Sequence, residues 1–322
     1  MKRLITVVML VVSALWALGA SAQMYPNRPI KLIVADSAGG APDQLGRLIT
    51  ERLSNNVNQP VVVDNRPGAG GALGAELAAK SAPDGYTLLL TTTAIYAILP
   101  NLRKNLPYDP VRDFVPITRI ATASNVLVVN NELPVKDIAE LVKLAKEKPG
   151  ALNYASAGVG TPAHLAGEML NLLADIKVVH VPYKGAAPAL ADVIGGNAQY
   201  IITSPLAAGA HMNGGRVRAL ATTGTQRNPS LPDLATIAET LPGYDITQTW
   251  GIVVPTGTPP EIVNKLSAEI VKVINQPDVR EKVLATGATP VGDSPAQFEA
   301  FMTKERQRLG DVIAKRGIVL TD

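Results

Sequence analysis

Hydrophobic residues along the chain follow two alternating patterns that together predict an α/β fold. Short apolar runs bounded by turn residues, at 29–35, 61–64 and 87–91, predict buried strands. Apolar residues at helical spacing between these runs predict helices over 42–55 and 72–80. Strands that alternate with helices form parallel sheets with right-handed crossovers, so the first part of the chain predicts one α/β domain.

The alternation resumes after a break near residue 109, and it predicts a second domain. A strand at 114–120 is expected to lead out of the first domain, and one at 125–129 to enter the second, followed by an amphipathic helix at 135–146. Further strands are expected at 153–156, 177–182, 200–203 and 217–222, with helices from 162 and over 187–194. The last of these strands is expected to complete a second βαβ set, and a strand at 250–255 returns to the first domain.

Two motifs near the C-terminal end predict helix starts. Thr258-Pro259-Pro260-Glu261 has the spacing of a capping box with proline at the first helical position, and it opens a helix to about Asn275. Ser294-Pro295-Ala296-Gln297 repeats the device for a last helix that ends near Lys315.

Two crossings between the domains, near 120–125 and 245–250, predict a hinge. Domain 1 then comprises residues 23–121 and 250–322, and domain 2 comprises residues 122–249. Ligands of open parallel sheets bind at the carboxyl ends of the strands, so the glycine-rich turns there should converge on a cleft between the domains.

The N-terminal residues predict export. A basic Met1-Lys2-Arg3, an apolar run from Leu4 to Leu18 and the small residues Ala20-Ser21-Ala22 form a secretory signal peptide cut after Ala22. A membrane anchor fits less well, since the apolar run is shorter than the roughly 20 residues that span a bilayer. We therefore expect a periplasmic protein.

The amino-acid composition argues against several classes of function. There are 30 basic and 27 acidic residues, and removal of Lys2 and Arg3 leaves 28 against 27, a net charge of +1 that argues against a nucleic-acid partner. There is no cysteine, and the three histidines are scattered without metal-ligand spacing. We expect no metal and no cofactor.

The most informative stretch is Asn153–Leu172, in which a strand leads through a glycine turn into a helix. Thr161 is suited to the N-cap and Pro162 to the first helical turn. Backbone N–H groups and the helix dipole favour an anion at such a turn. We predict that it holds a carboxylate and that a second turn, Ser37–Asp43, faces it.

Two enzymatic alternatives are weaker. Gly158–Ala163 matches G-x-G-x-x-A, but export, Pro162 and the lack of a following strand that ends in an acid disfavour a dinucleotide. No G-x-S-x-G elbow is present, although Ser156, His164 and Asp192 combine on paper into a hydrolase triad.

The charged residues and the histidine at these turns each have two interpretations, one structural and one as a ligand contact. Asp43 either bonds across its turn, with Arg47 as an (i, i+4) partner, or recognises a donor on the ligand. His164 either points into the cleft or covers the turn. Lys184 is the cation beside a cleft turn, where lysine is usually solvated.

An ordered set of motifs makes the chain similar to the Bug (TctC-like) family, the extracytoplasmic solute receptors of tripartite tricarboxylate transporters. The landmarks are Gly39-Gly40 with Asp43 and Arg47, Asn65–Gly71, Pro83–Leu88, Gly158–Leu165, Val181–Gly185, Leu220-Ala221 and Pro255–Pro259. The resemblance implies a two-domain periplasmic binding protein of the Venus flytrap, type II-like class. It implies a small organic carboxylate as ligand and transient contact with the membrane subunits of a transporter, and we expect a monomer.

The resemblance also implies the ligand-binding residues. In domain 1 they are Ser37, Ala38, Gly39, Gly40, Ala41, Asp43, Thr92 and Thr93; in domain 2 they are Ser156, Gly158, Val159, Gly160, Thr161, His164 and Ser204. Ser37 stands where the family usually has proline, and Thr203-Ser204 lacks the family's Asp or Asn. These departures affect the part of the cleft that sets specificity. An exported α/β hydrolase-like enzyme and a periplasmic sensor remain the alternatives.

Overall fold

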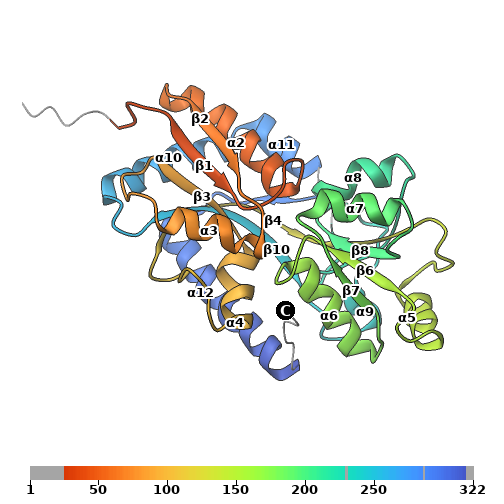
Figure 1. Ribbon diagram of the computed structural model, residues 1–322. Helices are drawn as coiled ribbons and strands as arrows, with labels where there is room; N and C mark the ends of the chain where they lie inside the picture. The colour runs from red at the N-terminus through yellow and green to blue at the C-terminus, as the bar shows by residue number, and fades with distance from the viewer. Residues whose placement is uncertain (1–24, 229–230, 286, 317–322) are drawn as a thin grey trace, which may run out of the picture.

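A computed structural model describes residues 25–228, 231–285 and 287–316 (Figure 1). The expected signal peptide, residues 1–22, lies outside the described residues. Two β-sheets, each covered by helices on both faces, form two halves joined by long strands. No described helix is long and apolar enough to cross a membrane.

The first half contains a 6-stranded sheet in the order β11-β4-β10-β3-β1-β2. Its strands are β1 (Ile30–Val34), β2 (Val61–Asn65), β3 (Thr87–Thr92), β4 (Phe114–Ser124), β10 (Thr247–Pro255) and β11 (Thr289–Pro290). β1 pairs in parallel with β2 and β3, as predicted. β10 returns from the second half and lies antiparallel between β3 and β4.

Helices cover both faces of this sheet because strand residues alternate between them. Leu32 and Val34 pack on the side of α2, whereas Ile33 packs on the opposite side with α3. The first face carries α2 (Ala41–Val57), α10 (Pro260–Ile274) and α11 (Pro277–Ala285). The second carries η1 (Ala69–Gly71), α3 (Ala72–Ala79), the π-helical turn η2 (Ala94–Ile98), α4 (Leu99–Leu102) and α12 (Pro295–Arg316).

The second half contains a 5-stranded sheet in the order β7-β6-β8-β5-β9. Its strands are β5 (Val126–Val129), β6 (Asn153–Ser156), β7 (Val179–Pro182), β8 (Tyr200–Thr203) and β9 (Arg218–Thr222). Its helices are α5 (Ile138–Glu147), α6 (Pro162–Ala174) and α9 (Ile237–Thr240) on one face, with α7 (Ala186–Ile194) and α8 (Pro205–Asn213) on the other. β6, β7 and β8 are parallel, but β5 lies antiparallel between β8 and β9. The expected second βαβ set is therefore interrupted, because the strand that enters this half separates β8 from β9.

The two halves are connected through β4 and β10, which pair over the full length of β10, from Thr247–Ser124 to Pro255–Phe114. β4 passes into β5 at Asn125, and the chain returns through Ile246. The division of the chain at 121/122 and 249/250 stays a prediction.

One of the two predicted capping boxes is confirmed. Ser294 Oγ accepts from Gln297 N at 3.3 Å, and Gln297 Oε1 accepts from Ser294 N at 2.9 Å. The box at Thr258 is wrong, because Pro259 takes the N-cap position of α10 without a side-chain bond. The Thr258 hydroxyl instead donates to the Pro255 carbonyl at 2.7 Å and closes the preceding turn.

Candidate functional site

A cavity of about 320 Å³ lies between the two halves. Its wall comes from the turns after β1, β2 and β3 in the first half and from the turns after β6, β7 and β8 in the second. Its position confirms that the carboxyl ends of these strands converge, as the topology predicts.

The predicted site residues divide into those that line this cavity and those that lie behind its wall. The lining residues are Ala41, Thr92, Gly158, Val159, Thr161 and Ser204. Those outside the lining are Ser37, Ala38, Gly39, Gly40, Asp43, Thr93, Ser156, Gly160 and His164. Ligand contact by any of them stays a prediction, and the second set includes residues that hold the turns in shape.

The turn between β6 and α6 has the expected form. Thr161 is the N-cap of α6, and its Oγ1 accepts from His164 N at 3.3 Å. Gly158 N donates to Ser156 Oγ at 3.1 Å, and Gly160 N donates to the His164 Nδ1 at 3.2 Å. The Val159 N–H has no acceptor within the described chain. It is therefore a turn amide left for a ligand at the positive end of the α6 dipole.

Two neutral imidazoles support this turn from behind. The rings of His164 and His180 stack with centroids 4.1 Å apart, and Tyr154 stacks on His180 at 4.8 Å. Burial lowers the pKa of His164 to about 4. Burial, reinforced by His164, lowers that of His180 to about 3. Both rings are neutral at pH 7, and His164, 4% exposed, covers the turn rather than facing the cavity.

The hydrolase triad is not assembled. Ser156 Oγ lies 2.7 Å from His180 Nε2, not beside His164, and Ser156 is fully buried. None of the described carboxylates bonds to either ring. Asp192 instead accepts from the hydroxyl of Tyr183 and from Asn197. This agrees with the weak standing of the triad in the sequence, where spacing alone did not support it, because Asp192 bonds in a different part of the second half.

Asp43 holds the first-half turn together. Its carboxylate accepts from Gly39 N at 2.9 Å, Arg47 Nε at 3.0 Å and Asn65 Nδ2 at 3.0 Å, and the residue is 3% exposed. Burial opposes its ionisation, but these hydrogen bonds outweigh it and hold the pKa of Asp43 below its usual value. The geometry matches the structural alternative and includes the expected pair with Arg47.

Asp36 is an acid in the cavity wall that the sequence analysis missed. Its Oδ1 accepts from Ser37 N at 2.7 Å. Loss of hydration raises the pKa of Asp36 to about 6, with Asp43 adding to the rise and the bonds from Ser37 opposing it. An acid directly after the buried strand 29–35 was the available signal, since strand ends line such clefts.

Glycines mark the points where the two halves touch. A β-carbon on Gly185 would clash with Ser37 Oγ and lie 2.8 Å from Asp36 Oδ1. One on Gly70 would clash with the Val159 carbonyl, and one on Gly160 with the Leu99 side chain. The cleft is thus closed, and each contact leaves no room for a side chain on the glycine.

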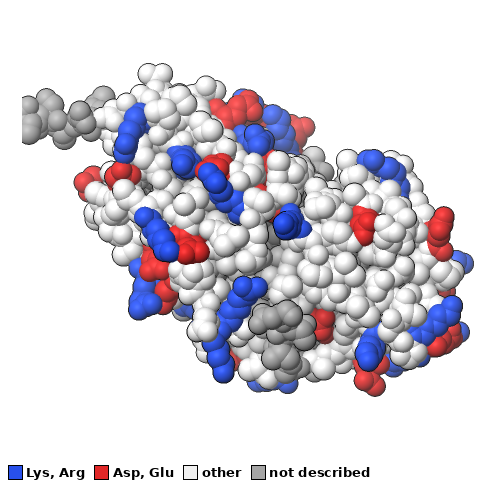
Figure 2. Space-filling model, viewed as in Figure 1, with Lys and Arg blue, Asp and Glu red and all other residues white. Residues whose placement is uncertain are grey.

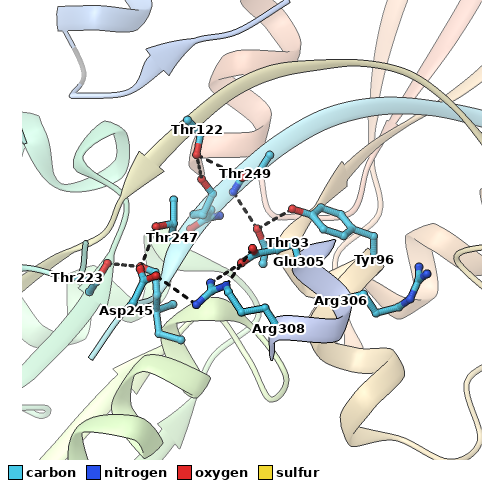
Figure 3. A network of polar contacts seen from close by, with 12 residues as sticks. Thr93, Tyr96, Thr122, Thr223, Asp245, Thr247, Thr249, Glu305, Arg306 and Arg308 are labelled. Atoms are coloured by element: carbon cyan, nitrogen blue, oxygen red, sulfur yellow. Dashed lines mark hydrogen bonds and ion pairs between the residues drawn. The ribbon is translucent and has the colours of Figure 1, made fainter. Parts of the chain in front are cut away.

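The threonines after β3 have separate roles. Thr92 lines the cavity, whereas Thr93 is fully buried and its Oγ1 accepts from Thr249 N of β10 at 2.9 Å (Figure 3). In the same region Arg308 of α12 bonds to Asp245, just before β10, at 3.2 Å. These contacts tie the returning strand to the first half, so Thr93 supports the connection rather than the cavity wall.

Two cations also line the cavity. Lys184 follows β7, and Arg103 follows α4. Neither forms an ion pair within the described residues, and the Arg103 Nε is buried without a hydrogen-bond partner. Arg103 was missed because it comes from a segment far from the glycine turns. Elsewhere on the face in view, charges of both signs are scattered in small groups (Figure 2).

The described residues contain no group of three or more His, Asp or Glu side chains placed to hold a metal ion. The site therefore combines backbone amides, two cations, one unpaired acid and small residues with Tyr183 and Gln248. Such a set suits reversible binding of an anionic small molecule.

The fold and the cavity between the halves define a two-domain solute-binding protein. A family profile described as "Tripartite tricarboxylate transporter family receptor" (TctC) matches residues 45–318, and the chain belongs to this family. This confirms the resemblance inferred from the motifs.

Known proteins are similar to this chain over nearly its whole length. BugT of Bordetella pertussis (strain Tohama I) is 35% identical over 323 residues, covering 99% of this chain and 99% of BugT. The structure "R. palustris Rpa4515 with adipate" is 35% identical with a TM-score of 0.89, covering 92% of this chain and 99% of that one. MatC from Rhodopseudomonas palustris with bound malate is 31% identical with a TM-score of 0.86, covering 90% and 100%. These similarities confirm the α/β binding-protein fold.

Proposed function

We propose that this chain is a periplasmic receptor that captures a small organic carboxylate between its two halves and delivers it to the membrane subunits of a tripartite tricarboxylate transporter. The closed cavity carries the proposal, because it joins the unpaired Val159 N–H at the start of α6 to the cations Lys184 and Arg103. The relatives solved with adipate and with malate support a carboxylate as the ligand.

In this mechanism the carboxylate binds first to the turn before α6, where an amide and the helix dipole attract it. Closure then brings Gly70 against Val159 and Ser37 against Gly185, which removes the ligand from water. His164 and His180 stay neutral, so the turn holds the anion without a buried ion pair. A binding site of this kind releases its ligand when the halves separate.

A thermal-shift panel of mono- and dicarboxylates, with the matching amides and amines as controls, tests the proposal. A ligand at 100 times its Kd stabilises a protein by about 2.7 kcal/mol, which gives a clear rise in Tm. We expect carboxylates to raise Tm and their amides to have no effect. If every carboxylate leaves Tm unchanged, or the amides act equally well, the receptor proposal is wrong.

The same preparation tests the remaining elements of the proposal. The exported protein should begin at Gln23 by mass spectrometry and elute as a monomer. The bound acid should be recovered chemically unchanged, whereas conversion would support an enzyme. Deletion of the chain should abolish uptake of that acid; intact uptake with a lost transcriptional response would support a sensor.

A further inference from the structure

Asp36 occupies a place in the cavity wall where the two halves meet. It follows β1 directly, and its Oδ1 lies against Gly185 of the second half. Gly185 N donates in turn to Ala157 O at 3.0 Å, and Ala157 immediately precedes the turn that carries Val159. A single hydrogen bond, from Gly185 N to Ala157 O, therefore links the residue beside Asp36 to the turn that is predicted to hold the carboxylate.

This carboxylate has no cationic partner among the described residues. Its bonds come from Ser37, through the backbone N–H at 2.7 Å and the hydroxyl at 3.4 Å. Lys184 lines the same cavity, yet no ion pair within 4.0 Å joins it to Asp36. The nearby Asp43 is itself an acid, and the cation beside it, Arg47, is bonded to Asp43 and not to Asp36.

An unpaired carboxylate in a closed cleft opposes closure, since its charge loses water and gains little in return. The cations in the wall, Lys184 and Arg103, form no ion pair with Asp36 within the described residues. The remaining source of a partner for Asp36 is the ligand itself.

We infer that Asp36 sets the specificity of the receptor by bonding to a hydrogen-bond donor, a hydroxyl or an ammonium group, carried by the carboxylate ligand. The inference rests on the proposed function and narrows the ligand to hydroxy or amino carboxylic acids. The ligand's carboxylate takes the Val159 amide, and its donor reaches across to the first half. A plain acid of the same length leaves Asp36 desolvated and unpaired.

Matched series of ligands test this inference by isothermal titration calorimetry. Succinate, malate and aspartate share one carbon skeleton and differ in hydrogen, hydroxyl or ammonium at C2; adipate and its 2-hydroxy and 2-amino forms extend the comparison. We expect the best donor-bearing acid to bind at least about 10-fold more tightly than its plain analogue, as a charge-assisted hydrogen bond allows.

The substitution Asp36→Asn removes the charge and keeps an oxygen for the Ser37 N–H. It should reduce the preference for the ammonium form to less than about 3-fold, while a hydroxyl keeps part of its advantage. Asp64→Asn is the matched control, because Asp64 lies near the end of β2, outside the cavity lining, and pairs with Lys31 and Arg66. This variant should keep the full preference.

The outcomes separate the inference from the proposed function. If no carboxylate of either series or of the wider panel binds, the proposed function fails. If carboxylates bind but the wild type prefers the plain acids, the inference fails and the function stands. An unchanged preference in Asp36→Asn also overturns the inference. So does an equal loss of affinity for plain and donor-bearing acids, which would indicate that Asp36 pairs with Lys184 instead. Circular dichroism of each variant confirms the fold, and the wild-type series alone is decisive if a variant does not fold.

Discussion

The two strand–turn–helix units that face each other across the cleft are held by the same kind of hydrogen bond, but the accepting side chain differs. In each, a side chain of the helix accepts the N–H four residues earlier: Asp43 from Gly39 and His164 from Gly160. The first turn is thus held by a carboxylate and the second by a neutral imidazole. We propose that the neutral second turn is the better place for an anion, and that the second half therefore grips the carboxylate.

The helix starts differ in the same way. Thr161 caps α6 with its hydroxyl, whereas Gly40 at the N-cap of α2 makes no side-chain bond. Asp36 adds a second acid to the first turn. We propose on this basis that the first half recognises what else the ligand carries and that the second half holds the carboxylate.

The largest expected effect comes from blocking closure at the second turn. Gly160→Val adds a side chain at φ +79° and into Leu99 of the other half, so we expect at least a ~100-fold loss of carboxylate affinity, about 2.8 kcal/mol. Gly150→Val is the matched control, since Gly150 has φ +77° with open space around it. Titration calorimetry compares the two. Unchanged affinity in Gly160→Val refutes the placement of the carboxylate.

Removal of the acid that holds the first turn should cost stability. Asp43→Asn weakens hydrogen bonds to Gly39, Arg47 and Asn65, and we expect a loss of about 2 kcal/mol in unfolding free energy at pH 7. The pKa of Asp43 is lowered by folding, so its contribution is present above the unfolded pKa of about 4 and is lost as pH falls through the folded value. Urea titrations at pH 7 and pH 3 measure the difference. An equal loss at both pH values contradicts this role of its charge.

The charge of Asp36 should affect the free energy of unfolding in the opposite direction. Its pKa is raised to about 6 by folding, so stability is highest below about pH 4 and falls as pH rises through 6. Asp36→Asn should therefore stabilise the ligand-free protein at pH 7 by about 1 kcal/mol, after allowance for its partial exposure, with no gain below pH 4. The same urea titrations detect it. Destabilisation at pH 7 would mean that the charge is already paired.

The smallest effect is expected at the cap of the second turn. Thr161→Ala removes the oxygen that accepts from His164 N and should cost about 1 kcal/mol, whereas Thr161→Ser should retain most of it. Thermal unfolding of the two variants measures the cap. Equal stability of the alanine and serine forms would show that the hydroxyl contributes nothing.

Local patterns predicted most of the fold because they depend on neighbours in sequence. The periodicity located the strands and helices, and Thr161-Pro162 and Ser294–Gln297 gave correct helix starts. Thr258 failed because a single proline moved the N-cap by one residue. The position of β5 between β8 and β9 could not be predicted from a local pattern, since long-range pairing decides it.

The site was predicted unevenly for the same reason. The glycine turns could be recognised as anion sites, but the sequence could not show that Ser156 and His164 use their side chains to occupy two of the amides. Arg103 lies in no motif, and Asp36 is a single acid after a strand. Their importance depends on what the other half places against them, which only the closed structure reveals.

A crystal structure of the complex with the tightest-binding carboxylate tests the division of roles most directly. We predict a carboxylate oxygen within hydrogen-bond distance of Val159 N, at the start of α6, with the halves closed over it. A carboxylate held by the first-half turn near Asp36, without contact to residues 158–161, would contradict it.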